Sequence, residues 1–209
     1  GRIKVRAAVP AISVALEDRV PTVRESAAAA LALIGDPAGV AALLRAIGGP
    51  EPSVVIQVVT ALGRIGDAAA LPDLCRLLAD GGSELRACAA TALGEIGGTA
   101  AVEALCRALD DPNASVRLQV VSALYLLAGS AAGVPFRMRA AIPRLQAFSG
   151  SLSLEATDLR QMARKTLQRI EAGTGKTKQL PLPSEGTASD PAHLPLPAGS
   201  PALETDSEA

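Results

Sequence analysis

The chain repeats itself every 31 residues, and this period limits the possible folds more than any other feature of the sequence. The phrases "ALALIGD", "ALGRIGD" and "ALGEIGG" begin at positions 30, 61 and 92. A second apolar segment follows each phrase, and these segments read "VAALLRAI", "LPDLCRLL" and "VEALCRAL". Self-similarity at such a period predicts stacked copies of one small structural unit.

Each unit is expected to be a pair of helices. Within both segments, apolar residues recur at steps of three and four, which is typical of amphipathic helices. A pair of about thirty residues cannot bury its apolar face alone, so the units must stack. The sequence therefore predicts an all-α fold, an α-solenoid of antiparallel helix pairs.

The residues between the segments fit helix ends. Gly35, Gly66 and Gly97 stand where the first helix of a unit should end in a left-handed conformation. Gly63 and Gly94 lie inside first helices, where we expect them to permit close helix approach. Candidate N-caps are Thr22, which has capping-box spacing to Glu25, Ser53, Ser115 and, before Pro37, Asp36.

The period breaks near the start of the chain and again after position 128. Residues 9–18 match a second helix without its partner, so we expect a truncated first unit in a piece of a longer array. An insertion near 129–141 delays the next second helix to Ile142. This insertion is either a plain loop or part of a binding face. Its candidate binding residues are Phe136, Arg137 and Arg139.

The last helix should begin behind Asp158 as N-cap and end near Ala172, with a solvated basic face. That face would carry Arg160, Arg164, Lys165 and Arg169. The composition then changes to Pro, Gly and Ser without apolar periodicity. We therefore expect a solenoid over 1–172 and a disordered tail over 173–209.

Composition narrows the class of partner. The chain carries a net charge of −1 and only 1% aromatic residues, which disfavours nucleic acid. No apolar run is long enough to cross a bilayer, so no membrane partner is expected. The three cysteines, at positions 75, 88 and 106, lie in apolar helical patterns without C-x-x-C spacing. They predict buried, reduced thiols and, because no signal peptide is visible, a cytoplasmic location.

The sequence offers no catalytic constellation. The only histidine, His193, lies in the predicted tail, which excludes a His-based triad or a His-rich metal site in the folded part. We therefore expect no enzyme, no cofactor and no metal.

One polar feature recurs with the period. Arg45, Arg76 and Arg107 occupy the same position of three successive second helices. They would form a stripe that suits carboxylate-bearing partners, because arginine grips carboxylates bidentately. The other interpretation is a set of helix-surface ion pairs, formed with Asp73 and Glu103.

The pattern of a VR opening, an IGD stop and a second apolar segment resembles the HEAT repeat, in the short bacterial form known from phycocyanobilin lyases. The resemblance covers about residues 1–172 and implies a second-helix layer on a concave binding surface. It also implies a structural ladder of Asp and Arg, six residues apart, linking successive units. Residues at that spacing are Asp18/Arg24, Asp80/Arg86 and Asp111/Arg117, whereas Gly49/Val55 lack both groups, so one rung is missing.

The family resemblance implies a non-catalytic scaffold that binds a protein partner on the concave face. The alternative, which rests on the repeat subtype alone, is a bilin lyase-like protein or a lyase subunit.

Overall fold

The computed structural model describes residues 6–129, 141–151 and 157–177. The chain divides into two units, residues 1–179 and 180–209, and every described residue lies in the first. The described residues form helices and turns, with no strand among them. The prediction of an all-α repeat fold is confirmed.

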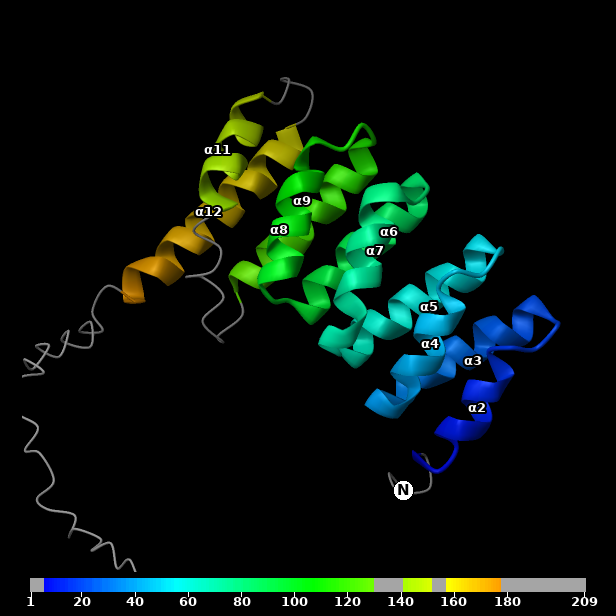
Figure 1. Cartoon of the computed structure of the whole chain (residues 1–209). Coiled ribbons are helices and arrows are strands. Elements are labelled where there is room, and N and C mark those ends of the chain that lie inside the picture. The colour runs from blue at the N-terminus through cyan, green and yellow to red at the C-terminus, as the bar shows by residue number, and fades with distance from the viewer. Residues whose placement is uncertain (1–5, 130–140, 152–156, 178–209) are drawn as a thin grey trace, which may run out of the picture. The chain divides into compact units, whose positions relative to one another are not determined.

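The first helices of the units lie side by side in one layer (Figure 1). Each packs on the next along the chain, and the long helix α12 (Thr157–Thr177) packs on the last of them. These first helices are α3 (Pro21–Ile34), α5 (Pro52–Ile65), α7 (Ser83–Ile96) and α9 (Ala114–Ala128).

The second helices are shorter, and each packs against the first helix that follows it in the chain. Three of them are joined to a single turn of 3₁₀-helix: η1 (Pro37–Gly39), η2 (Ala68–Ala70) and η3 (Ala108–Asp110). The second helices are α2 (Val9–Ala15), α4 (Val40–Ala46), α6 (Leu71–Asp80), α8 (Thr99–Arg107) and α11 (Ile142–Ser151).

The period of the sequence reappears in the core. Leu31, Leu62, Leu93 and Leu124 stand 31 residues apart, and each is at most 1% exposed. The buried set consists mainly of Leu, Val and Ala, because few aromatic residues are present to fill the space between helices. Removing such a leucine typically costs about 2–5 kcal/mol, so this row contributes strongly to stacking.

The glycine positions behave as the sequence predicts, except that Gly97 ends α7 with φ of 76° and ψ of −159°, outside the left-handed helical region. Gly35 and Gly66 end α3 and α5 with φ of 65° and 76°, in the left-handed region. A Cβ on Gly63 would lie 2.9 Å from the Cα of Ala92, and one on Gly94 would lie 2.8 Å from the Cβ of Ala123. Neighbouring first helices therefore approach too closely for a side chain at either glycine.

Several helix starts differ from the prediction. α3 and α5 begin at Pro21 and Pro52, so Thr22 and Ser53 lie inside the first turn and are not N-caps. A proline suits this position because its φ is already helical and it needs no hydrogen-bond acceptor. Asp36 is an N-cap as predicted, since its carboxylate accepts from the amide of Ala38 at 3.0 Å.

At α9 the capping residue is Asn113 rather than Ser115. The side-chain oxygen of Asn113 accepts from the amides of Ser115 at 2.9 Å and Val116 at 3.4 Å. Within the described part of the chain, the predicted capping box at Thr22 also makes no side-chain cap; instead the Ser26 hydroxyl donates to the Thr22 carbonyl.

The last helix is longer than predicted. α12 already includes Asp158, so that residue is not the N-cap, and the helix continues past Ala172 to Thr177. Arg169 is not simply solvated, because its guanidinium lies 4.5 Å from the ring centre of Tyr125 on α9. Residues 130–140, with the candidates Phe136, Arg137 and Arg139, and the tail from 178 lie outside the described residues.

Candidate functional site

The three recurrent arginines lie on the second-helix face, the surface formed by α4, α6, α8 and α11. All three are exposed, but two have partners within the chain. Arg45 lies 3.4 Å from the carboxylate of Glu17, which belongs to the preceding unit. Arg76 pairs with Asp73 of its own helix at 2.5 Å. Among the described residues, no ion pair joins Arg107 to Glu103, although both are exposed on α8.

The arginines therefore do not form a row of equivalent free guanidinium groups. Arg76 follows the helix-surface interpretation, and Arg45 pairs across to a neighbouring unit. Exposed pairs of this kind contribute about 0–1 kcal/mol each, so a partner's carboxylate competes with them at little cost.

Hollows recur between successive second helices. One of about 260 Å³ lies between α4 and α6, and the next, of about 280 Å³, lies between α6 and α8. A third, of about 340 Å³, lies between α8 and α11. Arg76 lines the first, and Arg107 lines the second and the third. Each of these hollows is thus lined by both apolar and charged side chains.

The third hollow contains an arginine that the repeat pattern did not point to. Arg144 of α11 donates to the backbone carbonyl of Cys106 on α8 at 2.9 Å. It follows the insertion, where the 31-residue register no longer applies, so periodicity gave no signal for it. With Arg107 and Glu103 on the same rim, the hollow has an excess of positive charge.

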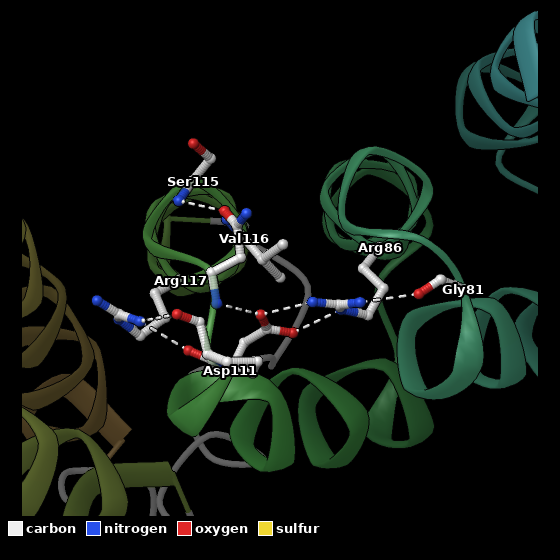
Figure 2. A network of polar contacts seen from close by, with 8 residues as sticks. Gly81, Arg86, Asp111, Ser115, Val116 and Arg117 are labelled. Atoms are coloured by element: carbon white, nitrogen blue, oxygen red, sulfur yellow. Dashed lines mark hydrogen bonds and ion pairs between the residues drawn. The ribbon is translucent and has the colours of Figure 1, made fainter.

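The ladder predicted from Asp and Arg is visible between two units. Arg86 of α7 donates from Nε and Nη2 to both carboxylate oxygens of Asp111, at 2.7 and 2.9 Å (Figure 2). Its Nη1 donates to the carbonyl of Gly81 at 2.8 Å. The Arg86 hydrogen bonds hold the pKa of Asp111 below its ordinary value, and the amide of Asn113 adds to this effect.

The rungs join an arginine to the acid of the following unit, not to the acid six residues before it. Within one unit, Arg24 donates to the backbone carbonyl of Asp18 at 2.7 Å, and Arg117 donates to that of Asp111 at 2.7 Å. Arg24 reaches Glu51 of the next unit at 2.6 Å. Glu51 stands two residues after Gly49 and takes the place of the acid that Gly49 lacks.

The gap in the ladder consequently lies between Val55 and Asp80. Val55 occupies the register position of Arg24 and Arg86, and it is 3% exposed. Asp80 is exposed and has no hydrogen bond or ion pair with any residue that the structure describes.

The cysteines are free thiols, of which Cys106 is buried and the other two are half-buried. Burial raises the pKa of Cys75, Cys88 and Cys106, with Arg107 opposing the shift at Cys75 and Arg144 opposing it at Cys106. A raised pKa lowers the thiolate fraction, which makes these thiols less reactive.

Over the same described ranges, no three His, Cys, Asp or Glu residues gather in a way that would hold a metal ion. None of the helices described there has the length and apolar character needed to span a membrane.

Comparison with solved structures identifies several repeat proteins of the same fold. The CpcE–CpcF complex of phycocyanin lyase from Nostoc sp. PCC7120 matches at 23% identity over 84% of each chain, with a TM-score of 0.53. A designed armadillo repeat protein in complex with the peptide (KR)4 matches at 20% identity over 80% of this chain and 87% of its own, with a TM-score of 0.53.

A third structure, from computationally designed armadillo repeat proteins for modular peptide recognition, matches at 21% identity with a TM-score of 0.52. It covers 80% of this chain and 83% of its own. No curated protein sequence gives a significant match. The family model for HEAT repeats matches residues 1–59 and 42–125, which together span more than half of the sequence. The chain belongs to the HEAT-repeat proteins.

Proposed function

We propose that this protein is a non-catalytic scaffold that binds a protein partner on the second-helix face. The observation that carries the proposal is the series of hollows between α4, α6, α8 and α11, each lined by apolar and charged side chains. Such a series suits an extended partner, because each hollow accepts one anchoring side chain. Two structural neighbours support it, because one was solved in complex with the peptide (KR)4 and the other as the complex of CpcE and CpcF.

The test replaces the three exposed arginines together. R45E/R76E/R107E reverses the charge of the second-helix face, and a matched variant, R19E/R64E/R164E, reverses three exposed arginines outside the second helices. We expect the native partner to be captured from cell extract by the wild type and the matched variant but not by the first variant. All three proteins should keep the same helical circular dichroism. If R45E/R76E/R107E captured the partner as well as the matched variant does, the second-helix face would not be the binding surface.

A second candidate function is that of a bilin lyase-like protein or a subunit of one. It is supported by the structural similarity to a phycocyanin lyase complex. Binding of a linear tetrapyrrole changes its absorption spectrum, so mixing phycocyanobilin with the protein tests this function directly. An unchanged spectrum at high micromolar concentrations of both would exclude it.

A further inference from the structure

The hollow between α4 and α6, called the α4–α6 groove below, differs from the next hollow along the chain because its ladder acid, Asp80, has no arginine partner in the described part of the chain. It is lined by apolar side chains from the end of each helix, Ile47 and Leu77, and by three charged groups. These charged groups are Asp73, Arg76 and Asp80. Because Asp73 and Arg76 pair with each other at 2.5 Å, the charge left in the groove is that of Asp80.

The next groove along the chain shows what Asp80 lacks. There the equivalent residue, Asp111, receives two hydrogen bonds from Arg86 and one from the amide of Asn113 at 2.8 Å. Asp18, in the same register, accepts from the amide of Val20 at 2.8 Å. In the described part of the chain, neither kind of donor reaches the carboxylate of Asp80.

The cause lies in the sequence of α5. The arginine that should reach Asp80 would stand at position 55, 31 residues before Arg86, and this position is Val55. This rung of the ladder therefore has its acid, Asp80, but no arginine at position 55. The acid lies beside an open groove of about 260 Å³ instead of a guanidinium.

We propose that this groove binds an arginine side chain of the protein partner, whose guanidinium takes the place of the missing arginine at Asp80. This proposal rests on the proposed function, because it assigns one anchoring point on the second-helix face. The aliphatic part of the guest lies against Ile47 and Leu77, which favours a long side chain with a charged end. Arginine fits better than lysine because it binds a carboxylate through two parallel hydrogen bonds.

The experiment is an NMR titration, in which ¹H–¹⁵N correlation spectra of the ¹⁵N-labelled protein are recorded with increasing amounts of a peptide. The peptide is Gly-Leu-Arg-Leu-Gly, acetylated at its N-terminus and amidated at its C-terminus. Its counterpart carries citrulline in place of arginine, which keeps the shape and removes the charge. We expect the arginine peptide to shift the amide resonances of Leu77, Gly81 and Gly82. The citrulline peptide should bind about tenfold more weakly, as expected for the loss of a charge-assisted hydrogen bond.

Two variants test the assignment to Asp80. D80N removes the charge and should weaken the arginine peptide about tenfold. V55R restores the missing rung within the chain, so it should compete for Asp80 and weaken the peptide to a similar degree. E95Q is the matched control, because Glu95 is an exposed carboxylate on α7 that lines none of the three hollows. It should leave the affinity unchanged.

Equal affinity of the wild type and D80N, or of the arginine and citrulline peptides, would overturn the proposal. Because V55R changes a buried position, its folding is checked by thermal unfolding, and D80N decides the result if V55R does not fold. Failure here is distinct from failure of the proposed function. If the partner is captured through the second-helix face but the peptide does not bind at Asp80, the proposed function is retained. The arginine site at Asp80 is then wrong.

Discussion

At the residue scale, the pair of Arg86 and Asp111 is the best-defined polar contact between two units. Their side chains are 17% and 7% exposed, and the guanidinium binds both carboxylate oxygens. Asp111 also holds the turn into α9 through the amide of Asn113. Removing one partner from such a pair leaves the other charge without compensation, which costs more than the pair itself contributes.

We therefore expect D111N to lower the free energy of unfolding by about 1–3 kcal/mol. The substitution removes the charge that Arg86 requires but keeps an oxygen that can accept from Asn113. Urea unfolding followed by circular dichroism measures the change. D110N, on the exposed neighbour, should stay within about 0.5 kcal/mol of the wild type. Equal losses in both variants would show that the pair has no special role.

The same pair predicts a dependence of stability on pH. The pKa of Asp111 is lowered in the folded protein, first by the Arg86 hydrogen bonds, so the folded state releases this proton more readily than the unfolded chain. Its stabilising contribution is fully present above the unfolded pKa of about 3.9 and is lost as the pH falls through the lower folded pKa.

The difference in unfolding free energy between wild type and D111N should therefore be largest near pH 7 and shrink from about pH 4 downward. Urea unfolding of both proteins at pH 7, 4 and 3 measures it. A constant difference over this range would contradict the assigned pKa shift.

At the element scale, the spacing of the first helices depends on glycine. A Cβ on Gly94 would meet both Cβ and Cα of Ala123, at 2.8 and 3.0 Å, and the atoms it meets belong to a neighbouring helix rather than to a flexible side chain. Alanine normally favours a helix over glycine by about 1 kcal/mol, so here packing and helix propensity act in opposite directions.

We expect packing to dominate, so that G94A loses about 1–3 kcal/mol of stability because α7 and α9 must separate. G48A is the control, since a Cβ built on Gly48 has nothing within 4 Å. It should be neutral or slightly stabilising in the same urea titration. A stable G94A would mean that the two helices can move apart freely.

The elements were more predictable from the sequence than their contacts. Apolar periodicity and the glycine stops located the helices, because both depend on neighbours within one segment. The starts at Pro21 and Pro52 were missed, since serine and threonine next to them offered competing caps. The partner of Arg24 was missed for a different reason: Glu51 lies outside the repeat register, and only the stacking of units brings the two together.

Asp80 illustrates the same limit. The sequence showed that Gly49 and Val55 lack the ladder groups, but not that each belongs to a different rung. Arg144 could not be predicted at all, because the insertion before α11 removes the register that made the other arginines visible. Contacts that follow the repeat are therefore predictable, and contacts at its interruptions are not.

At the scale of the whole molecule, the described helices act as a stack in which each unit is stabilised by its neighbours. The last unit is fixed to that stack by α12, whose residue Ile170 is fully buried and whose Arg169 lies over Tyr125 of α9. A stabilising cation–π contact of this type contributes about 0.5–1 kcal/mol at an exposed site. α12 should therefore resist proteolysis as the repeats do, up to Thr177 and beyond the end at Ala172 that the sequence predicts.

Limited proteolysis tests this expectation. With low concentrations of proteinase K, we expect cleavage first in the Pro- and Ser-rich sequence after Thr177 and within 130–140, because the sequence of both stretches lacks the apolar periodicity of the repeats. Mass spectrometry of the products should show that the repeats from α2 to α9 persist and that α12 remains bound to them. Y125A should release α12 earlier, since it removes the surface under Arg169. Early cuts scattered through α3, α5 and α7 would contradict a stack whose units protect one another.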